Sequence, residues 1–244
     1  MKLVETFKAW KDLWKYRGKA SYSQCGEDLI VAFLLLEALK IPHPYYLDIG
    51  AHHPIHLSNT YLFYKQGCQG VCVEPDPDLC ERIKRIRKMD VCINAGIGTE
   101  KKDRADFYIM SAKTLNTFSR AEAQANVDGR NHRIERVIQI PLISIEQIIQ
   151  ENFKSCPHYV SLDTEGMDLA ILKALNFRKF RPEVLCVETL THPQLQKVNE
   201  IDALMRGNGY FTYADTFINT IFVNKEAWAN NSSPGRVDSS RFQQ

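Results

Sequence analysis

The sequence lacks any apolar segment that could cross a membrane. Its longest apolar run is Leu29 to Leu36, whereas a spanning helix needs about 20 predominantly apolar residues. The N-terminus also lacks a continuous apolar core followed by a small-residue cleavage site, so it does not match a secretory signal. From these absences we expect a cytoplasmic protein.

Paired cysteines and a charge of one sign are missing as well. The seven cysteines contain no C-x-x-C pair, and Cys72, Cys92 and Cys186 lie inside apolar strand patterns. This usage is typical of buried free thiols in a reducing compartment. Lys and Arg number 31 against 29 for Asp and Glu, which gives a net charge of +2. The balance provides no broad cationic field, and we expect no nucleic-acid partner.

The chain divides into an N-terminal segment, one domain and a polar tail. Within residues 1–20, apolar residues recur at helical spacing from Leu3 to Trp14 with lysines between them, which predicts an amphipathic basic helix. Such a helix either docks on the domain or touches a membrane surface weakly. Residues 21–229 form the predicted domain, and the Asn, Ser, Pro and Gly content of residues 230–244 predicts a disordered tail. The sequence does not indicate an oligomeric state.

Strand and helix patterns alternate along most of the domain. Ser23 is the predicted N-cap of a first helix, and after Pro42 the alternation predicts an α/β fold with a mostly parallel sheet and helices on both faces. The final patterns "YFTYAD" and "NTIFVNK" predict a hairpin that closes the sheet. Residues 104–140 interrupt the alternation with two strand patterns around a polar stretch, which predicts a small β insertion that contacts the substrate.

Polar or acidic residues end four of the predicted strands. A ligand of an open parallel sheet binds beyond the carboxyl ends of its strands, where the strand order reverses. Four polar endings in corresponding positions therefore indicate a binding site. The residues concerned are Asp48 with Gly50, Glu74 with Asp76, Asn94, and Asp163 with Glu165.

The glycine pattern after the first strand narrows the choice of ligand. A nicotinamide dinucleotide would need G-x-G-x-x-G, but His52 and Ile55 occupy the second and third glycine positions, so a pyrophosphate could not approach that backbone. S-adenosylmethionine has ribose hydroxyls and no pyrophosphate. In this interpretation Gly50 accommodates the methionine portion, Glu74 accepts the ribose hydroxyls, and Asn94 is either an adenine contact or a turn residue.

Several ordered motifs resemble one known family. "LDIGA", "VEPDP", "NAGIG", "ISIEQII" and "SLDTEGMDLAILKAL" are similar to the successive motifs of the FkbM family of S-adenosylmethionine-dependent methyltransferases. The resemblance covers about Ser21 to Phe222. It implies a Rossmann-like class I methyltransferase fold, a seven-stranded sheet with one antiparallel strand, and methyl transfer to oxygen, often of sugars or other small hydroxylated compounds. Where many members of this fold have a second glycine, this chain has His52.

The remaining cofactor and catalytic residues follow from these motifs. Asp48, Ala51, Asp76 and Asp163, with Gly50, are expected to hold the cofactor, although Asp48 could instead cap the following helix. Gln24 and Glu27 form either an ordinary helix start or a lid over the cofactor. The predicted catalytic residues are His52, His53, Asp163 and Glu165, where one of the two histidines takes the proton of the acceptor hydroxyl.

The acids also raise the question of a metal. Glu188 and His192 are predicted to bind the acceptor beside Asp163 and Glu165. Crowded carboxylates must be separated, protonated or neutralised by a cation such as magnesium. We expect a metal-independent enzyme, because a turn at Gly166 would separate the two acids. A zinc site formed by His52 and His56 on one helix face is the weaker alternative.

The sequence thus predicts an S-adenosylmethionine-dependent O-methyltransferase that acts on a sugar, a glycan or another small hydroxylated compound. The activated methyl group of the cofactor leaves the protein to align the acceptor oxygen and remove its proton. The alternative is a non-catalytic module that keeps the fold and the cofactor and regulates a partner, for which the basic N-terminal helix is the main support.

Overall fold

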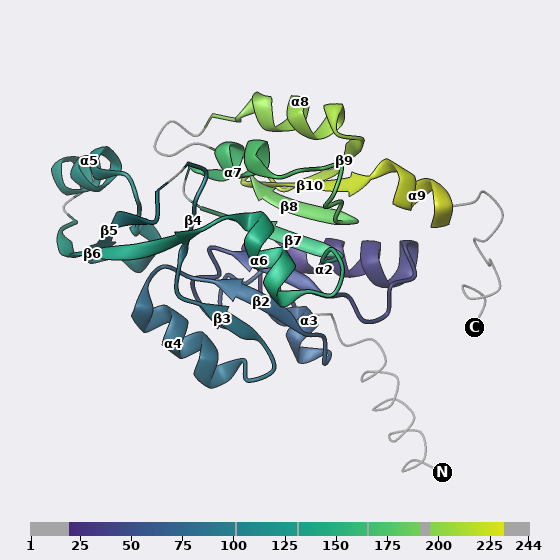
Figure 1. Cartoon of the computed structure of the whole chain (residues 1–244), viewed down its shortest axis with the longest axis horizontal. Coiled ribbons are helices and arrows are strands. Elements are labelled where there is room, and N and C mark those ends of the chain that lie inside the picture. The colour runs from purple at the N-terminus through teal and green to yellow at the C-terminus, as the bar shows by residue number, and fades with distance from the viewer. Residues whose placement is uncertain (1–19, 101, 131, 165, 191–195, 232–244) are drawn as a thin grey trace, which may run out of the picture.

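The computed structural model describes residues 20–100, 102–130, 132–164, 166–190 and 196–231. In this part of the chain a seven-stranded sheet has the order β3-β2-β1-β7-β8-β10-β9 and helices on both faces (Figure 1). Strand β10 runs antiparallel to both β8 and β9, and the other pairings are parallel. The strands are β1 (Tyr46–Ile49), β2 (Gly70–Val73), β3 (Val91–Ile93), β7 (Tyr159–Leu162), β8 (Val184–Glu188), β9 (Tyr210–Asp215) and β10 (Asn219–Asn224). The predicted class I methyltransferase fold is confirmed.

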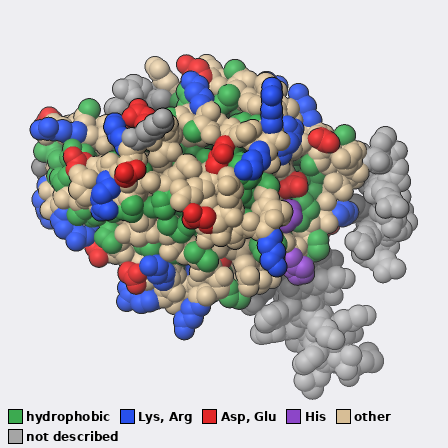
Figure 2. Space-filling view, viewed as in Figure 1, with side chains coloured by type: hydrophobic (Ala, Val, Ile, Leu, Met, Phe, Trp, Pro, Cys, Tyr) green, Lys and Arg blue, Asp and Glu red, His purple; other side chains and the backbone are tan. Residues whose placement is uncertain are grey.

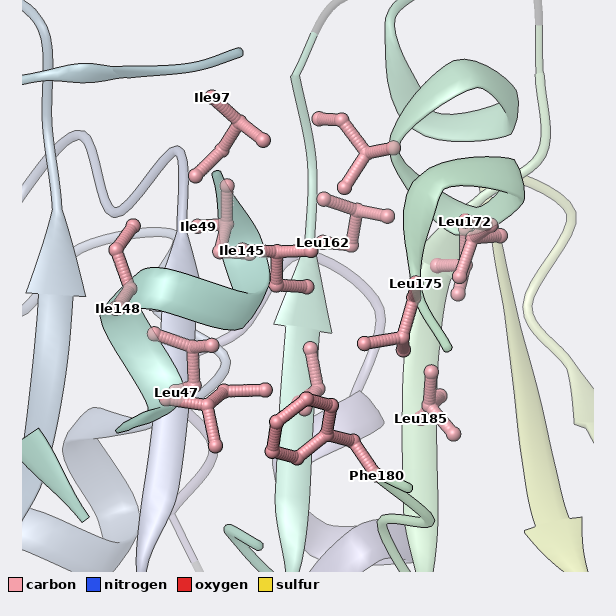
Figure 3. Close-up of a cluster of buried hydrophobic side chains, with 14 of the residues drawn as sticks. Leu47, Ile49, Ile97, Ile145, Ile148, Leu162, Leu172, Leu175, Phe180 and Leu185 are labelled. Atoms are coloured by element: carbon pink, nitrogen blue, oxygen red, sulfur yellow. The ribbon is translucent and has the colours of Figure 1, made fainter. Parts of the chain in front are cut away.

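Three helices cover one face of the sheet. Figure 3 shows side chains of β1, β7 and β8 packed against α6 (Ile145–Asn152) and α7 (Asp168–Ala174). Helix α8 (Asn199–Gly207) joins the same apolar cluster through Ile201 and Met205. Ser144 caps α6, because its hydroxyl accepts a hydrogen bond from the Gln147 N–H at 3.1 Å.

The other face is covered by a second set of helical segments from both ends of the domain and from its first half. These are α2 (Glu27–Ala32), the π-helical segment η1 (Phe33–Ala38), α3 (Tyr61–Lys65), α4 (Pro77–Ile86) and α9 (Lys225–Asn231). Because side chains alternate along a strand, Leu47 and Ile49 of β1 enter the cluster under α6, whereas Tyr46 packs with α2 and α3. Asp48 belongs to the Tyr46 side, a placement that affects the site described below.

The insertion forms a second, three-stranded sheet in the order β4-β6-β5. Its strands are β4 (Gly96–Ile97), β5 (Arg104–Met110) and β6 (Ile134–Ile143). The sequence pattern predicts no helix in the polar stretch between β5 and β6, but this stretch contains the 3₁₀ helix η2 (Lys113–Leu115) and the helix α5 (Arg120–Arg130). The low apolar content of α5 gives no strong helical periodicity, so the sequence pattern concealed it.

Three of the sequence predictions concern the two ends of the chain. The N-cap of α2 is Gly26, with φ of +91°, rather than Ser23. The Ser23 hydroxyl instead accepts hydrogen bonds from the N–H groups of Gly26 and Asp28 at 3.1 and 3.3 Å. The predicted N-terminal helix lies outside the described residues. Of the predicted disordered tail, residues 230 and 231 form the end of α9, and residues 232–244 lie outside the described residues.

The distribution of surface charge and the lengths of the helices concern possible contact with nucleic acid or membrane. Lys and Arg are interspersed with Asp and Glu over the face shown in Figure 2. No helix in the described ranges combines the length and the apolar character that a membrane crossing requires.

A buried arginine joins the elements around β1. Arg87, just after α4, is fully buried, and its Nε lies 2.7 Å from Asp90 Oδ2. Its Nη1 lies 3.8 Å from Asp48 Oδ2, and its Nη2 donates to Thr60 Oγ1 at 2.9 Å. The Tyr46 hydroxyl donates to Asp90 at 2.8 Å. One cation thus compensates two buried carboxylates from different elements.

Replacing this cation tests how far the fold depends on it. We expect Arg87→Met to lower the free energy of unfolding by roughly 3–5 kcal/mol, because both carboxylates lose their compensating charge. Urea unfolding of Arg87→Met and of the exposed neighbour Arg85→Met measures the difference. The surface variant should change stability by about 0.5 kcal/mol or less. Equal effects of the two substitutions would contradict a central role for Arg87.

Candidate cofactor and acceptor site

A cavity of about 320 Å³ opens where β1, β2, β7 and β8 end. The insertion supplies one wall, and the turn after β9 and the start of α7 supply another. Its polar lining residues are Gln24, His52, Glu74, Lys113, Thr114, Asn116, Asp163, Thr164 and Glu188; its apolar ones include Leu57, Pro75, Phe107, Leu115, Phe118, Met167 and Ile218.

The turn after β1 lies directly against the end of β7. Gly50 has φ of +78°, and a Cβ atom built on it would lie 1.8 Å from the carbonyl oxygen of Asp163. The N–H groups of Gly50 and Ala51 both donate to the Val73 carbonyl, at 3.0 and 3.2 Å. Only glycine satisfies both the positive φ and the close approach. The strand ends therefore meet at the point where the sheet order reverses, which is the binding position of such folds.

His52 adopts the backbone conformation that a second glycine would favour. Its φ is +49°, in the left-handed region that glycine adopts more readily than a residue with a side chain. The His52 N–H donates to Glu74 Oε2 at 2.7 Å. The imidazole lines the cavity, and its Nε2 atom is buried without a hydrogen-bond partner. Burial lowers the pKa of His52, so the ring is neutral at pH 7.

The side chain of Glu74 accepts hydrogen bonds from two backbone N–H groups, and neither partner is a cation. Its two carboxyl oxygens accept the N–H groups of His52 and Asp76, each at 2.7 Å. Burial raises the pKa of Glu74 to about 8, although these hydrogen bonds oppose the shift. Each carboxylate oxygen has two lone pairs, so both oxygens retain capacity for further donors. Asn94 fixes the backbone here by donating to the carbonyls of Glu74 and Pro75, each at 2.9 Å.

A second acidic group lies at the ends of β7 and β8. Asp163 and Glu188 both line the cavity, and a side-chain hydrogen bond from Glu188 acts to lower the pKa of Asp163. Burial raises the pKa of Asp163 to about 6, against the lowering effect of Glu188. Burial also raises the pKa of Asp168 to about 7, and the charge of Asp163 adds to this shift. Asp168 was not among the predicted site residues. Gly166, with φ of +98°, makes the predicted turn after this strand.

Asp76 joins the insertion to the start of α4. This buried residue caps α4 by accepting from the Asp78 N–H at 2.9 Å. Its Oδ2 atom accepts from Asn116 Nδ2 at 3.0 Å and lies 3.2 Å from Lys113 Nζ. Lys113 and Asn116 line the cavity, whereas Asp76 does not. Asp76 thus positions the wall that the insertion provides.

Several predicted site residues lie outside the cavity lining. Strand alternation turns Asp48 toward Arg87 and Thr60, and Ala51 packs in the apolar cluster beside α4. Glu27 accepts hydrogen bonds from Thr216 Oγ1 at 2.6 Å, from Asn219 Nδ2 at 3.1 Å and from the Cys25 N–H at 2.8 Å. It therefore joins α2 to the turn between β9 and β10. Gln24, close in sequence, does line the cavity.

The histidines after β1 do not form a helix face. Residues 51–60 adopt turns and bends, so the helical spacing assumed for His52 and His56 is absent. His53 Nδ1 accepts the N–H groups of Ile55 and His56 at 3.1 and 2.9 Å, which stabilises the turn. In the described ranges no group of three or more His, Cys, Asp or Glu side chains is arranged to hold a metal ion. The predicted site residues Glu165 and His192 lie outside the described residues.

Sequence reasoning missed most of the walls of the cavity. Lys113, Asn116 and Phe118 come from a polar stretch without a recognisable motif, and Ile218 comes from a hairpin turn. The phenyl ring of Phe118 lies over Gly96, where a Cβ atom would come within 2.4 Å of it. The glycine of "NAGIG" was the only signal that something packs closely there.

Comparison with known proteins gave no curated relative, several structures of limited similarity and one family match. None of the curated proteins matches the chain significantly. An O-methyltransferase from Bacillus cereus in complex with S-adenosylhomocysteine is similar in structure, with 10% identity, a TM-score of 0.44, and coverage of 91% of this chain and 87% of that one. A TehB-like S-adenosylmethionine-dependent methyltransferase from Corynebacterium glutamicum has 10% identity, a TM-score of 0.43, and coverage of 91% and 97%.

The family follows from the sequence model of the methyltransferase FkbM domain, which matches residues 48–212. Since this is more than half of the chain, the protein belongs to the FkbM family of methyltransferases, and its cofactor is S-adenosylmethionine. The predicted family and the predicted cofactor are both confirmed. The residues present fit that cofactor, because the Gly50 cradle excludes any side chain and Glu74 retains acceptor capacity for ribose hydroxyls.

The Gly50 cradle provides a test of this site. We expect Gly50→Ala to lower the free energy of unfolding by at least about 2 kcal/mol, because of the positive φ and the overlap with the Asp163 carbonyl. The variant should also lose calorimetric binding of S-adenosylhomocysteine. Gly129→Ala in α5 is the matched control, since nothing lies within 4 Å of its added Cβ. Normal binding and stability of Gly50→Ala would exclude the close approach.

Proposed function

We propose that this methyltransferase transfers the methyl group of S-adenosylmethionine to a hydroxyl oxygen of a sugar or of another small hydroxylated compound. The observation that carries the proposal is the acid pair Asp163 and Glu188, which lines the same cavity as Gly50 and Glu74. One end of the cavity thus has acceptors suited to a ribose, and the other has a proton acceptor suited to the reacting hydroxyl.

The cofactor end is formed by β1 and β2. Glu74 accepts the ribose hydroxyls, the Gly50 turn lies against the methionine portion, and Pro75 with Gly96 borders the adenine. Asn94 contributes by fixing this backbone through its hydrogen bonds to the carbonyls of Glu74 and Pro75. Asp76 contributes by holding Asn116 of the insertion. When bound, the cofactor supplies a methyl group on a sulfonium, which needs no further activation.

The acceptor end is formed by β7, β8 and the insertion. Asp163 acts as the general base, because a carboxyl with a pKa of about 6 is mostly ionised at pH 7 yet basic enough to take a proton. The Glu188 carboxyl holds Asp163 in place through their hydrogen bond. Met167, the N-cap of α7, provides apolar contact for the carbon skeleton of the acceptor.

His52 is a second candidate for the base. Its neutral imidazole lines the cavity with an unpartnered Nε2 atom. Its backbone N–H bonds to Glu74, however, which places the residue at the ribose end. We therefore assign His52 to cofactor contact and Asp163 to proton transfer. Glu165 and His192 keep their predicted acceptor roles as part of this proposal.

The proposal includes independence from a metal ion. The support for this part of the proposal is the side-chain hydrogen bond between Asp163 and Glu188, which relieves the crowding of the two acids without a cation. The EDTA experiment below tests this point.

Glu74 gives the first test, through the pH dependence of S-adenosylhomocysteine binding. Because burial raises the pKa of Glu74 to about 8, the free protein holds this carboxyl protonated at lower pH. Ribose hydroxyls donate to the ionised form, so wild-type affinity should rise between about pH 6 and 8, by up to tenfold per pH unit. Glu74→Gln should bind at least about tenfold more weakly at pH 8 without this rise. Calorimetry measures both, with the exposed Glu81→Gln as control, and parallel pH profiles would refute ribose binding by Glu74.

The acid pair gives the second test, through formation of S-adenosylhomocysteine with a panel of glycans and small alcohols. We expect Asp163→Asn to lower kcat by about 100-fold or more while cofactor affinity stays near the wild-type value. The wild-type kcat should fall below about pH 6 as Asp163 is protonated, and His52→Gln should preserve that fall. Activity should survive exhaustive EDTA treatment. Loss of activity with EDTA and its recovery with magnesium would disprove metal independence, and methylation of amines alone would disprove transfer to oxygen.

A further inference from the structure

The sulfur atoms of two cysteines lie in contact between α4 and β3, the strand at one edge of the sheet. Cys80 Sγ of α4 lies 3.1 Å from Cys92 Sγ of β3. Cys80 is fully buried and Cys92 is 9% exposed, in an apolar cluster that includes Ala51, Cys72 and Ile83. Neither thiol takes part in the proposed reaction, so the contact requires a separate explanation.

The contact follows from how α4 packs on the edge of the sheet. Cys80 and Ile83 are three residues apart and lie on the buried face of the helix. Cys72 and Cys92 are register partners on the parallel strands β2 and β3, so Cys92 points to the side of the sheet that α4 covers. The backbone of both elements is fixed by secondary structure, which keeps the two sulfurs together.

We propose that Cys80 and Cys92 are a modification site, at which a peroxide converts the two thiols into an intramolecular disulfide. The Cys80 thiolate attacks one peroxide oxygen and becomes a sulfenic acid as the O–O bond breaks and water forms. The Cys92 sulfur then attacks the sulfenic sulfur, and a second water leaves. Two thiols and one hydrogen peroxide thus give one disulfide and two waters, and a thiol reductant reverses the change.

The electrostatic surroundings of the pair assign the roles within this reaction. The hydrogen bond shared with Cys92 lowers the pKa of Cys80, and Lys84 contributes in the same direction. The same hydrogen bond and burial raise the pKa of Cys92. Since the thiolate is the nucleophile toward peroxide, Cys80 is the first to react and Cys92 resolves the intermediate.

Metal binding is the obvious alternative for three thiols in one cluster. Cys72, Cys80 and Cys92 are not among any group of side chains arranged to hold a metal ion in the described part of the chain. Simple packing of free thiols is the other alternative. It predicts that both sulfurs stay unreacted, which the following experiment distinguishes.

The experiment treats fully reduced full-length protein with hydrogen peroxide, blocks the remaining thiols with iodoacetamide under denaturing conditions, and maps the peptides without reductant. We expect a cross-linked peptide pair with Cys80 and Cys92, a mass lower by two hydrogens, and reversal by dithiothreitol. The disulfide closes a short loop, so the Tm should rise by about 5 °C. Alkylation of the exposed Cys25 before and after treatment shows whether the oxidant has acted.

Matched variants separate this proposal from other outcomes. Cys80→Ala and Cys92→Ala keep the cluster apolar and should abolish both the cross-link and the Tm shift, whereas Cys72→Ala should retain them. The proposal is overturned if Cys25 is oxidised while Cys80 and Cys92 are both recovered as alkylated thiols. A cross-link that maps to a different pair would overturn it equally. Neither readout depends on methyl transfer, so failure here leaves the proposed function untouched.

Discussion

The contact between Gly50 and the carbonyl of Asp163 is the constraint on which the site depends. It brings the ends of β1 and β7 so close that no side chain fits between them. In the sheet order, β2 with the following Glu74 lies beyond β1 on one side, and β8 with Glu188 lies beyond β7 on the other. The cavity therefore has two acidic ends joined by bare backbone, as a ligand with a ribose at one end and a reactive group at the other requires.

The buried carboxylates of this fold fall into two groups according to what compensates them. On the α4 side of the sheet, Asp48 and Asp90 surround the guanidinium of Arg87, and their charges are neutralised for stability. On the cavity side, Glu74 and Asp163 have hydrogen bonds but no ion pair in the described part of the chain. Burial raises the pKa of Asp48 as it does for these two acids, but the charge of Arg87 opposes the rise only at Asp48. The fold thus holds its functional acids in a less favourable electrostatic state than its structural ones.

Sequence patterns predicted the sheet well because strand periodicity and the ordered motifs depend on local residues. They predicted the site less completely, for physical reasons. Two-residue alternation gives the face of a strand only when its neighbours are known, so Asp48 was placed with the cofactor although it faces Arg87. The insertion bonds through side chains such as Lys113 and Asn116, whose partner Asp76 is distant in sequence. Contacts of that kind leave no local pattern to read.

The buried carboxylate of Asp76 makes the two halves of the cavity dependent on each other. It caps α4, next to the cofactor turn, and it also carries Asn116 and Lys113 of the insertion. An insertion transplanted from a relative with another substrate would leave this carboxylate unpaired unless equivalent donors came with it. Replacement of the insertion in this protein by engineering is therefore restricted to segments that preserve this one anchor.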